Sequence, residues 1–130
     1  MKISSVRCAD VMVTAVDGRI DHQSAGQFEA ALAEPRDPPP AIPRSIVLDF
    51  AGVDYISSVG LRVLMVASQR ARKQGTRIAV AGPRPMVAEI FAISRFDRVL
   101  ELFPSVTDAL AQFSASALAA FEPPSRASAE

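Results

Sequence analysis

The sequence predicts an α/β fold in one domain, with a mixed, mostly parallel sheet of about five strands and about four helices. Three observations support this prediction. A chain of 130 residues, 49% of them hydrophobic, is long enough to bury one core. From residue 45 onward, short apolar segments alternate with segments of helical spacing, which is typical of parallel strands joined by helices. Two strand patterns near the amino terminus are joined by so short a turn that they must pair antiparallel.

The first part of the chain predicts two strands and a short helix. Strands are expected at residues 2–7 and 11–16, with a turn at Ala9 and Asp10 between them. The dipeptide Asp-Gly that ends at Gly18 is a second turn signal. A short amphipathic helix is expected from Ser24 to Glu34, because its apolar residues recur at a spacing of three and four.

A proline-rich segment follows this helix. Residues 35–43 contain five prolines in nine positions. Proline lacks a backbone N–H and does not continue a helix, so residues 35–44 are expected to form an extended surface loop. A role as a proline-rich ligand is the other interpretation, and a spacer between helix and strand is the one we favour.

The middle of the chain predicts a buried strand and a long helix. Residues 46–50 form a nearly continuous apolar run, as expected for a strand that is covered on both faces. A helix is expected at 58–73, with basic residues in its last turn, which suits the helix dipole. Its inward face is expected to carry Leu61, Leu64, Met65, Ser68 and Ala71.

The last part of the chain repeats the alternation of strand and helix. Strands are expected at 77–81 and 99–102, and between them a helix that opens at Pro83 or Pro85. The inward face of that helix is expected to carry Met86, Val87, Ile90 and Phe91. Ser105 and Asp108 have the spacing of a capping box and predict a final helix. The domain is therefore expected to span 1–113, and the small and polar residues 114–130 to form a flexible tail.

Composition excludes several classes of function. The 14 basic and 14 acidic residues balance, which argues against nucleic acid or an anionic membrane as a partner. The chain has no run of 18 apolar residues and no apolar signal core, so we expect no integral membrane segment and a cytoplasmic location. Cys8 is the single cysteine and is expected to be a buried small hydrophobe rather than a redox site.

The junction between the buried strand and the long helix is the candidate functional site. Ser57 and Ser58 stand where the helix begins, at the positive end of its dipole. A serine there can cap the helix, act as a nucleophile or accept a phosphate. Gly60 in the first turn weakens the helix and is expected to leave its backbone open to another molecule. Local evidence alone favours a cap and leaves the phosphate acceptor open.

Catalysis has little support in this sequence. His22 is the single histidine and lies near a turn, and the pattern Gly-x-Ser-x-Gly is absent around Ser58. One histidine and one cysteine give no plausible metal-ligand set. No glycine-rich loop of the form Gly-x-x-x-x-Gly-Lys-Ser/Thr is present to bind nucleotide phosphates. We therefore expect no enzymatic activity, no cofactor and no bound metal.

The segment Ile46–Leu64 resembles the signature of STAS domains, specifically that of bacterial anti-sigma factor antagonists. Three further segments match that family in order and spacing. Val16–Asp21 resembles the turn after its second strand, Gly75–Gly82 the strand after the long helix, and Val106–Leu110 the final helix. The resemblance covers about residues 5–113.

The resemblance implies a phosphorylation site. The family pattern at the helix start is Asp-Ser-Ser/Thr-Gly-Leu, in which the serine after the aspartate is phosphorylated. Aligned on Gly60 and Leu61, this pattern places the acceptor at Ser58. Ser57 then stands at the aspartate position and is a competing acceptor, and Val59 replaces the second hydroxyl residue.

The resemblance also implies partners. The unphosphorylated form is expected to bind an anti-sigma factor that is a serine/threonine kinase. Phosphorylation of Ser58 is expected to end this binding, and a cognate phosphatase is expected to restore it. The alternative is a constitutive STAS adaptor subunit of a transporter or of a sensory, stressosome-like complex, in which the serines only cap the helix. The expected partner-binding residues are Asp21, His22, Ser24, Asp54, Tyr55, Ser57, Ser58, Val59, Gly60, Leu61 and Arg62.

Overall fold

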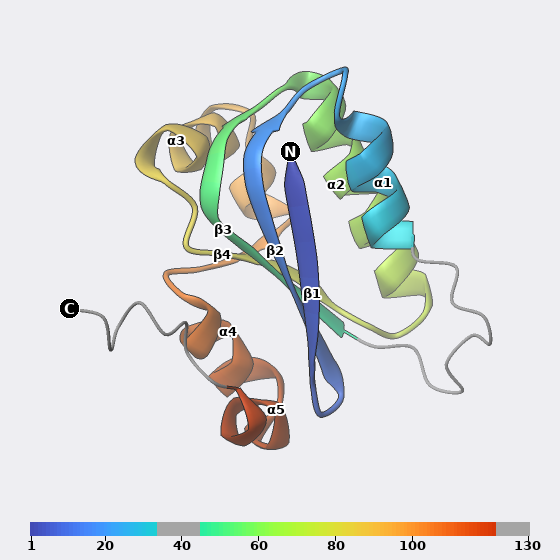
Figure 1. The fold of residues 1–130 in the computed structure, drawn as a ribbon, viewed down its shortest axis with the longest axis vertical. Helices are drawn as coiled ribbons and strands as arrows, with labels where there is room; N and C mark the ends of the chain where they lie inside the picture. Colours follow the sequence, from blue (N-terminus) through green and yellow to red (C-terminus); the bar gives the residue numbers. More distant parts are fainter. Residues whose placement is uncertain (34–44, 122–130) are drawn as a thin grey trace.

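The computed structural model describes residues 1–33 and 45–121, and these form one five-stranded sheet with helices on both faces (Figure 1). The strand order in the sheet follows the chain, from β1 to β5. The first two strands pair antiparallel and all further neighbours pair parallel, which confirms the predicted mixed, mostly parallel sheet. The strands are β1 (Lys2–Cys8), β2 (Val11–Ile20), β3 (Ser45–Ile56), β4 (Ile78–Ala81) and β5 (Glu101–Phe103).

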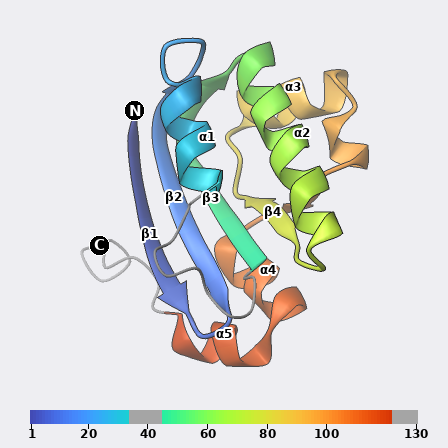
Figure 2. The ribbon, with the colours of Figure 1, turned by 90° about the vertical axis from the view of Figure 1, so that its right-hand side faces the viewer.

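The helices divide between the two faces of the sheet (Figure 2). The helices are α1 (Ala25–Ala33), α2 (Ser58–Lys73), α3 (Pro85–Ile93), the short 3₁₀ helix η1 (Phe96–Arg98), α4 (Val106–Phe113) and α5 (Ala115–Ala120). Side chains of α1, α2 and α3 pack with Leu48 and Phe50 of β3 in the larger core cluster. Side chains of α4 and α5 pack with Val47 of the same strand in the smaller cluster. Alternate residues of β3 thus supply both cores, as the apolar run at 46–50 predicts.

Aromatic rings join the strands to two of the helices. The ring of Phe50 lies 6.3 Å from that of Phe28 and 6.2 Å from that of Phe91, measured between centroids. All three side chains are fully buried. Cys8 is buried in the smaller cluster, and burial raises the pKa of its thiol. A buried thiol with a raised pKa behaves as a small apolar group, as predicted.

Two strands are longer than the sequence predicts. β2 continues past the turn signal at Gly18 to Ile20, and β3 continues past Phe50 to Ile56. The two strands stay paired because two register shifts, between Ala15 and Asp17 and between Gly18 and Arg19, absorb the irregular residues. Gly18 has φ +105°, which suits glycine in such a bulge. Ile20 and Ile56 are consequently register partners at the carboxyl ends of β2 and β3, where α2 begins.

Two methionines that the helical spacing places inward are exposed instead. Met65 on α2 is 37% exposed, because the buried face of this helix runs along Leu61, Leu64 and Ala67. Met86 on α3 is 60% exposed. The buried residues of α3 are Val87 and Phe91, so this short helix covers the sheet with a narrow stripe.

The beginning of the predicted tail forms a helix. Ser114 caps α5, its Oγ accepting a hydrogen bond from the Ala117 N–H at 3.2 Å. The same hydroxyl lies 2.7 Å from Asp10 Oδ1 and donates to it, which ties the helix to the β1–β2 turn. Ala117 is fully buried in the smaller core cluster. Residues 114–121 thus extend the packed domain beyond residue 113, while the proline-rich segment 35–44 and residues 122–130 lie outside the described residues.

In residues 1–33 and 45–121, no helix combines the length and the apolar character that crossing a bilayer requires.

Candidate functional site

The candidate site lies where β2 and β3 end and α2 begins. The backbone N–H of Ser57 donates to the carbonyl of Ile20 at 2.8 Å, which fixes the start of α2 against the end of β2. Ser57 is the N-cap: its Oγ accepts a hydrogen bond from the Gly60 N–H at 3.3 Å. Its backbone has extended geometry, with φ −86° and ψ 172°, as N-cap residues do. The side chain of Ser57 is therefore occupied in holding the helix start.

Ser58 is the first residue of α2 and its side chain is exposed. Among the described residues its hydroxyl has no hydrogen-bond partner. It lies at the positive end of the dipole of a 16-residue helix, where a negative group is favoured. The two serines thus differ: Ser57 caps the helix, and Ser58 presents an exposed hydroxyl.

Two residues of the predicted partner surface are buried instead. Gly60 and Leu61 face the sheet, and Leu61 is 8% exposed. A Cβ atom on Gly60 would lie 2.7 Å from Cγ2 of Ile20 and 2.8 Å from Cγ1 of Ile56. The close approach that the glycine permits is therefore made by the chain's own strand ends, not by another molecule. Sequence spacing could not show this, because Ile20 is forty residues away in the chain.

We expect Gly60→Ala to destabilise the fold by about 1–3 kcal/mol, because the added methyl group overpacks the contact with the two isoleucines. The better helix propensity of alanine offsets at most about 1 kcal/mol of that cost. Gly26→Ala on α1 is the matched control, since a Cβ there would meet no atom within 4 Å. Urea denaturation should show Gly60→Ala less stable than wild type and Gly26→Ala at least as stable. Equal stabilities of the two variants would contradict the proposed packing.

The loop between β2 and α1 forms a hydrogen-bonded turn beside this helix start. Asp21 Oδ1 accepts from the N–H groups of Gln23 at 3.0 Å and Ser24 at 3.2 Å. Desolvation acts to raise the pKa of the Asp21 carboxyl, but these hydrogen bonds together with the Ser24 hydroxyl lower it below its ordinary value. Ser24 Oγ also donates to the Arg19 carbonyl at 2.7 Å. His22 is exposed in the same turn, so three predicted residues lie together in one hydrogen-bonded loop.

The end of β3 carries Asp54 and Tyr55, each held by an arginine. The Arg19 guanidinium lies 4.6 Å from the centroid of the Tyr55 ring. Asp54 forms an ion pair with Arg84, whose Nε also donates to the Ala51 carbonyl at 2.8 Å. The sequence assigned no role to either arginine. Arg84 lies 30 residues from Asp54 in the chain, so no local pattern reveals the pair.

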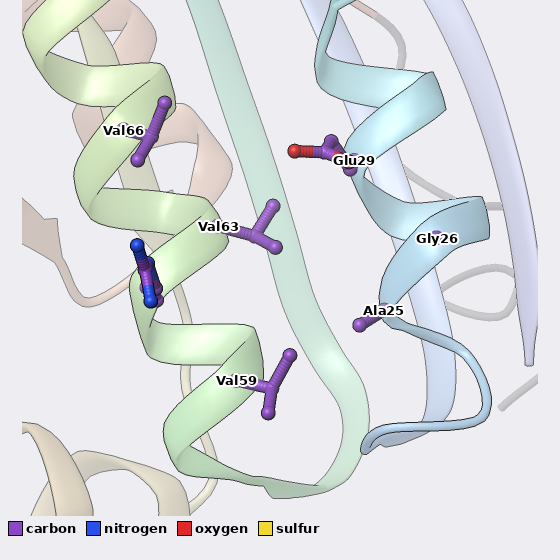
Figure 3. A pocket seen from close by; sticks show the side chains of 7 residues that line it. Ala25, Gly26, Glu29, Val59, Val63 and Val66 are labelled. Carbon is purple, nitrogen blue, oxygen red and sulfur yellow. The ribbon is translucent and has the colours of Figure 1, made fainter.

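A groove of about 210 Å³ lies between α1 and α2, and its lining on α2 begins at Val59, the residue after Ser58 (Figure 3). The predicted residues Val59 and Arg62 line it. Figure 3 shows Val59 and Val63 of α2 directed toward α1. The groove is lined by Ala25, Gly26, Glu29, Val59, Arg62, Val63 and Val66.

The described ranges contain no cluster of three or more histidine, cysteine, aspartate or glutamate side chains that could hold a metal ion. What the site offers is an exposed hydroxyl at a helix tip, a hydrogen-bonded neighbouring loop and a mostly apolar groove. Such an arrangement is suited to contact with another macromolecule.

Comparison with known proteins gives a consistent result. Residues 2–109 match the family profile described as STAS domain. The chain is 33% identical over 104 residues to BtrV of Bordetella bronchiseptica, which is named as an anti-sigma factor antagonist, and the match covers 80% of this chain and 84% of that protein. A protein of Thermotoga maritima described in the same terms has a similar structure, with a TM-score of 0.73, 16% identity, and coverage of 85% of this chain and 92% of that one. A sulfate transporter family protein of Wolinella succinogenes also shares the fold, with a TM-score of 0.69, 20% identity, and coverage of 82% and 87%.

Proposed function

The chain belongs to the STAS domain family, and we propose that it is an anti-sigma factor antagonist whose binding is switched off by phosphorylation of Ser58. The observation that carries this proposal is the division of roles between the two serines. Ser57 caps α2, so its hydroxyl is engaged, whereas the Ser58 hydroxyl is exposed at the helix tip. The similarity to BtrV supports the same class of function.

The position of Ser58 allows a phosphate without refolding. A phosphoserine carries about −1.5 to −2 charges, and a helix N-terminus stabilises such a group. The phosphate acts on partner binding, because a charged and bulky group within a contact surface prevents close docking. Arg62, one turn along α2, is near enough in the helix to meet a partner carboxylate or the phosphate.

In this proposal the protein has no catalytic activity of its own and works in the cytoplasm. Its partners are an anti-sigma factor that is a serine/threonine kinase and a phosphatase that removes the phosphate. The contact surface comprises the exposed members of the predicted set: the loop at Asp21–Ser24, the end of β3 at Asp54 and Tyr55, and the first turn of α2. Gly60 and Leu61 support this surface from beneath.

A phosphorylation assay with the anti-sigma factor kinases encoded in the same genome tests the proposal. With ATP, wild type should gain one phosphate by mass spectrometry, and Ser58→Ala should gain none. Ser57→Ala should still gain the phosphate, yet unfold more easily by about 1 kcal/mol because the helix loses its cap.

Two other results would lead to different conclusions. Phosphate that persists in Ser58→Ala and disappears in Ser57→Ala would assign the acceptor to Ser57. If no kinase modifies or binds the wild-type protein, the constitutive adaptor of a transporter or sensory complex becomes the better assignment.

A further inference from the structure

We propose that the groove between α1 and α2 receives the apolar ridge of an acidic helix on the anti-sigma factor, so that the partner surface extends from Ser58 along α2. This inference rests on the proposed function and specifies the chemistry of the partner. Three observations carry it: the charge of α2, the exposure of its apolar side chains and the open space at Gly26.

The charged side chains of α2 are all basic. Its 16 residues include four basic side chains and no acidic one, although the whole chain has a formal net charge of zero. Arg62, Arg70 and Lys73 follow one another at spacings of eight and three, on an exposed side of the helix. Complementary potentials favour encounter with an acidic surface and disfavour a basic one.

The same side of α2 exposes apolar groups. Val59 and Val66 are 44% and 39% exposed. Val59 and Val66 line the groove together with the half-buried Val63, so its α2 wall is a row of valines (Figure 3). An apolar row flanked by basic residues fits an amphipathic helix that carries apolar anchors and acidic neighbours.

The α1 wall is kept open at Gly26. Gly26 is the second residue of α1, and glycine is a poorer helix former than alanine, by up to about 1 kcal/mol in a helix interior. A Cβ atom at Gly26 would meet nothing within 4 Å, so the packing of this chain does not require the glycine. A larger side chain there would occupy the groove, because Gly26 is one of its lining residues.

The size of the groove favours a protein side chain over a small molecule. Its volume of about 210 Å³ is below the range of about 300–1,000 Å³ typical of ligand pockets. Glu29 on the α1 wall is directed toward α2 and would repel an acidic group (Figure 3). Acidic residues of the partner would therefore lie on the α2 side, near Arg62. A phosphate on Ser58 adds negative charge at one end of this surface, which disfavours the same partner.

Binding of the unphosphorylated protein to the kinase that modifies Ser58, measured by calorimetry, tests this inference. Gly26→Leu should fill the groove and weaken binding about tenfold or more, while Gln27→Leu, the exposed neighbour outside the groove, should bind like wild type. Arg62→Glu should weaken binding by a similar factor, while Arg72→Glu, the same charge change on another side of α2, should change it less than about twofold. Glu29→Gln should strengthen binding.

The possible outcomes separate this inference from the proposed function. Wild-type affinity in Gly26→Leu and Arg62→Glu, with Ser58 still phosphorylated, overturns the groove and leaves the switch intact. A loss in Gly26→Leu with unchanged affinity in Arg62→Glu overturns the acidic chemistry of the partner. A dimer of the protein alone that Gly26→Leu dissociates would assign the groove to a second copy. If wild type forms no complex with any such kinase, the proposed function fails and this inference fails with it.

Discussion

Phe50→Ala should lower the free energy of unfolding by about 3–5 kcal/mol, the largest loss of stability that we expect from a single substitution in this protein. The Phe50 side chain is fully buried, and its ring packs between those of Phe28 on α1 and Phe91 on α3. Removing it leaves a cavity where two helices meet the sheet. The total free energy of unfolding of a small domain is about 5–15 kcal/mol. The variant should therefore unfold at a much lower urea concentration than wild type.

The matched control is Ile93→Ala at the end of α3. Ile93 is 75% exposed, so its truncation should change the free energy of unfolding by no more than about 0.5 kcal/mol. A comparable loss in both variants would mean that Phe50 does not hold α1 and α3 on the sheet as described. At temperatures where part of the Phe50→Ala protein is unfolded, kinase binding should also weaken. The unfolded chain has no groove, since α1 forms one of its walls only in the folded state.

The order of the elements is predictable from the sequence because it depends on local periodicity. Each pattern can be recognised in one continuous segment of the chain: the apolar run at 46–50, the helical spacing at 58–73 and the cap at Ser105. The extent of β2 and β3 is not predictable in this way. Gly18 reads locally as a turn, yet pairing with Val53 keeps it inside the sheet as a bulge. Helix α5 was missed for the same reason, since it depends on the contact between Ser114 and Asp10 across 104 residues.

The candidate site was likewise predictable only in part from the sequence. Its location follows from the change of spacing at Ser57 and Ser58, but the sequence left open which serine caps the helix. The hydrogen bond from the Gly60 N–H to Ser57 Oγ decides that point in the structure. The groove was not predicted, because its walls come from two helices that are separated by β3 in the chain.

Ser58→Glu should lower the affinity for the kinase by about 100-fold, equivalent to about 2.7 kcal/mol, while the protein stays folded. The added carboxylate lies at the N-terminus of α2, where it should stabilise the helix by about 0.3–1 kcal/mol. It also lies at the end of the contact surface that faces an acidic partner in our proposal. Stability and affinity should therefore change in opposite directions. Thermal unfolding and calorimetry on the same samples measure the two effects.

Ser58→Gln is the control that separates charge from size, because glutamine has nearly the shape of glutamate without its charge. We expect Ser58→Gln to keep most of the affinity and Ser58→Glu to lose it. Raising the salt concentration should restore part of the affinity of Ser58→Glu, since exposed charges are screened over about 10 Å at 0.1 M salt. Equal losses in the two variants, unaffected by salt, would attribute the switch to bulk at the helix tip. A phosphate combines more charge with more bulk than either side chain, so phosphorylated protein should bind more weakly than both.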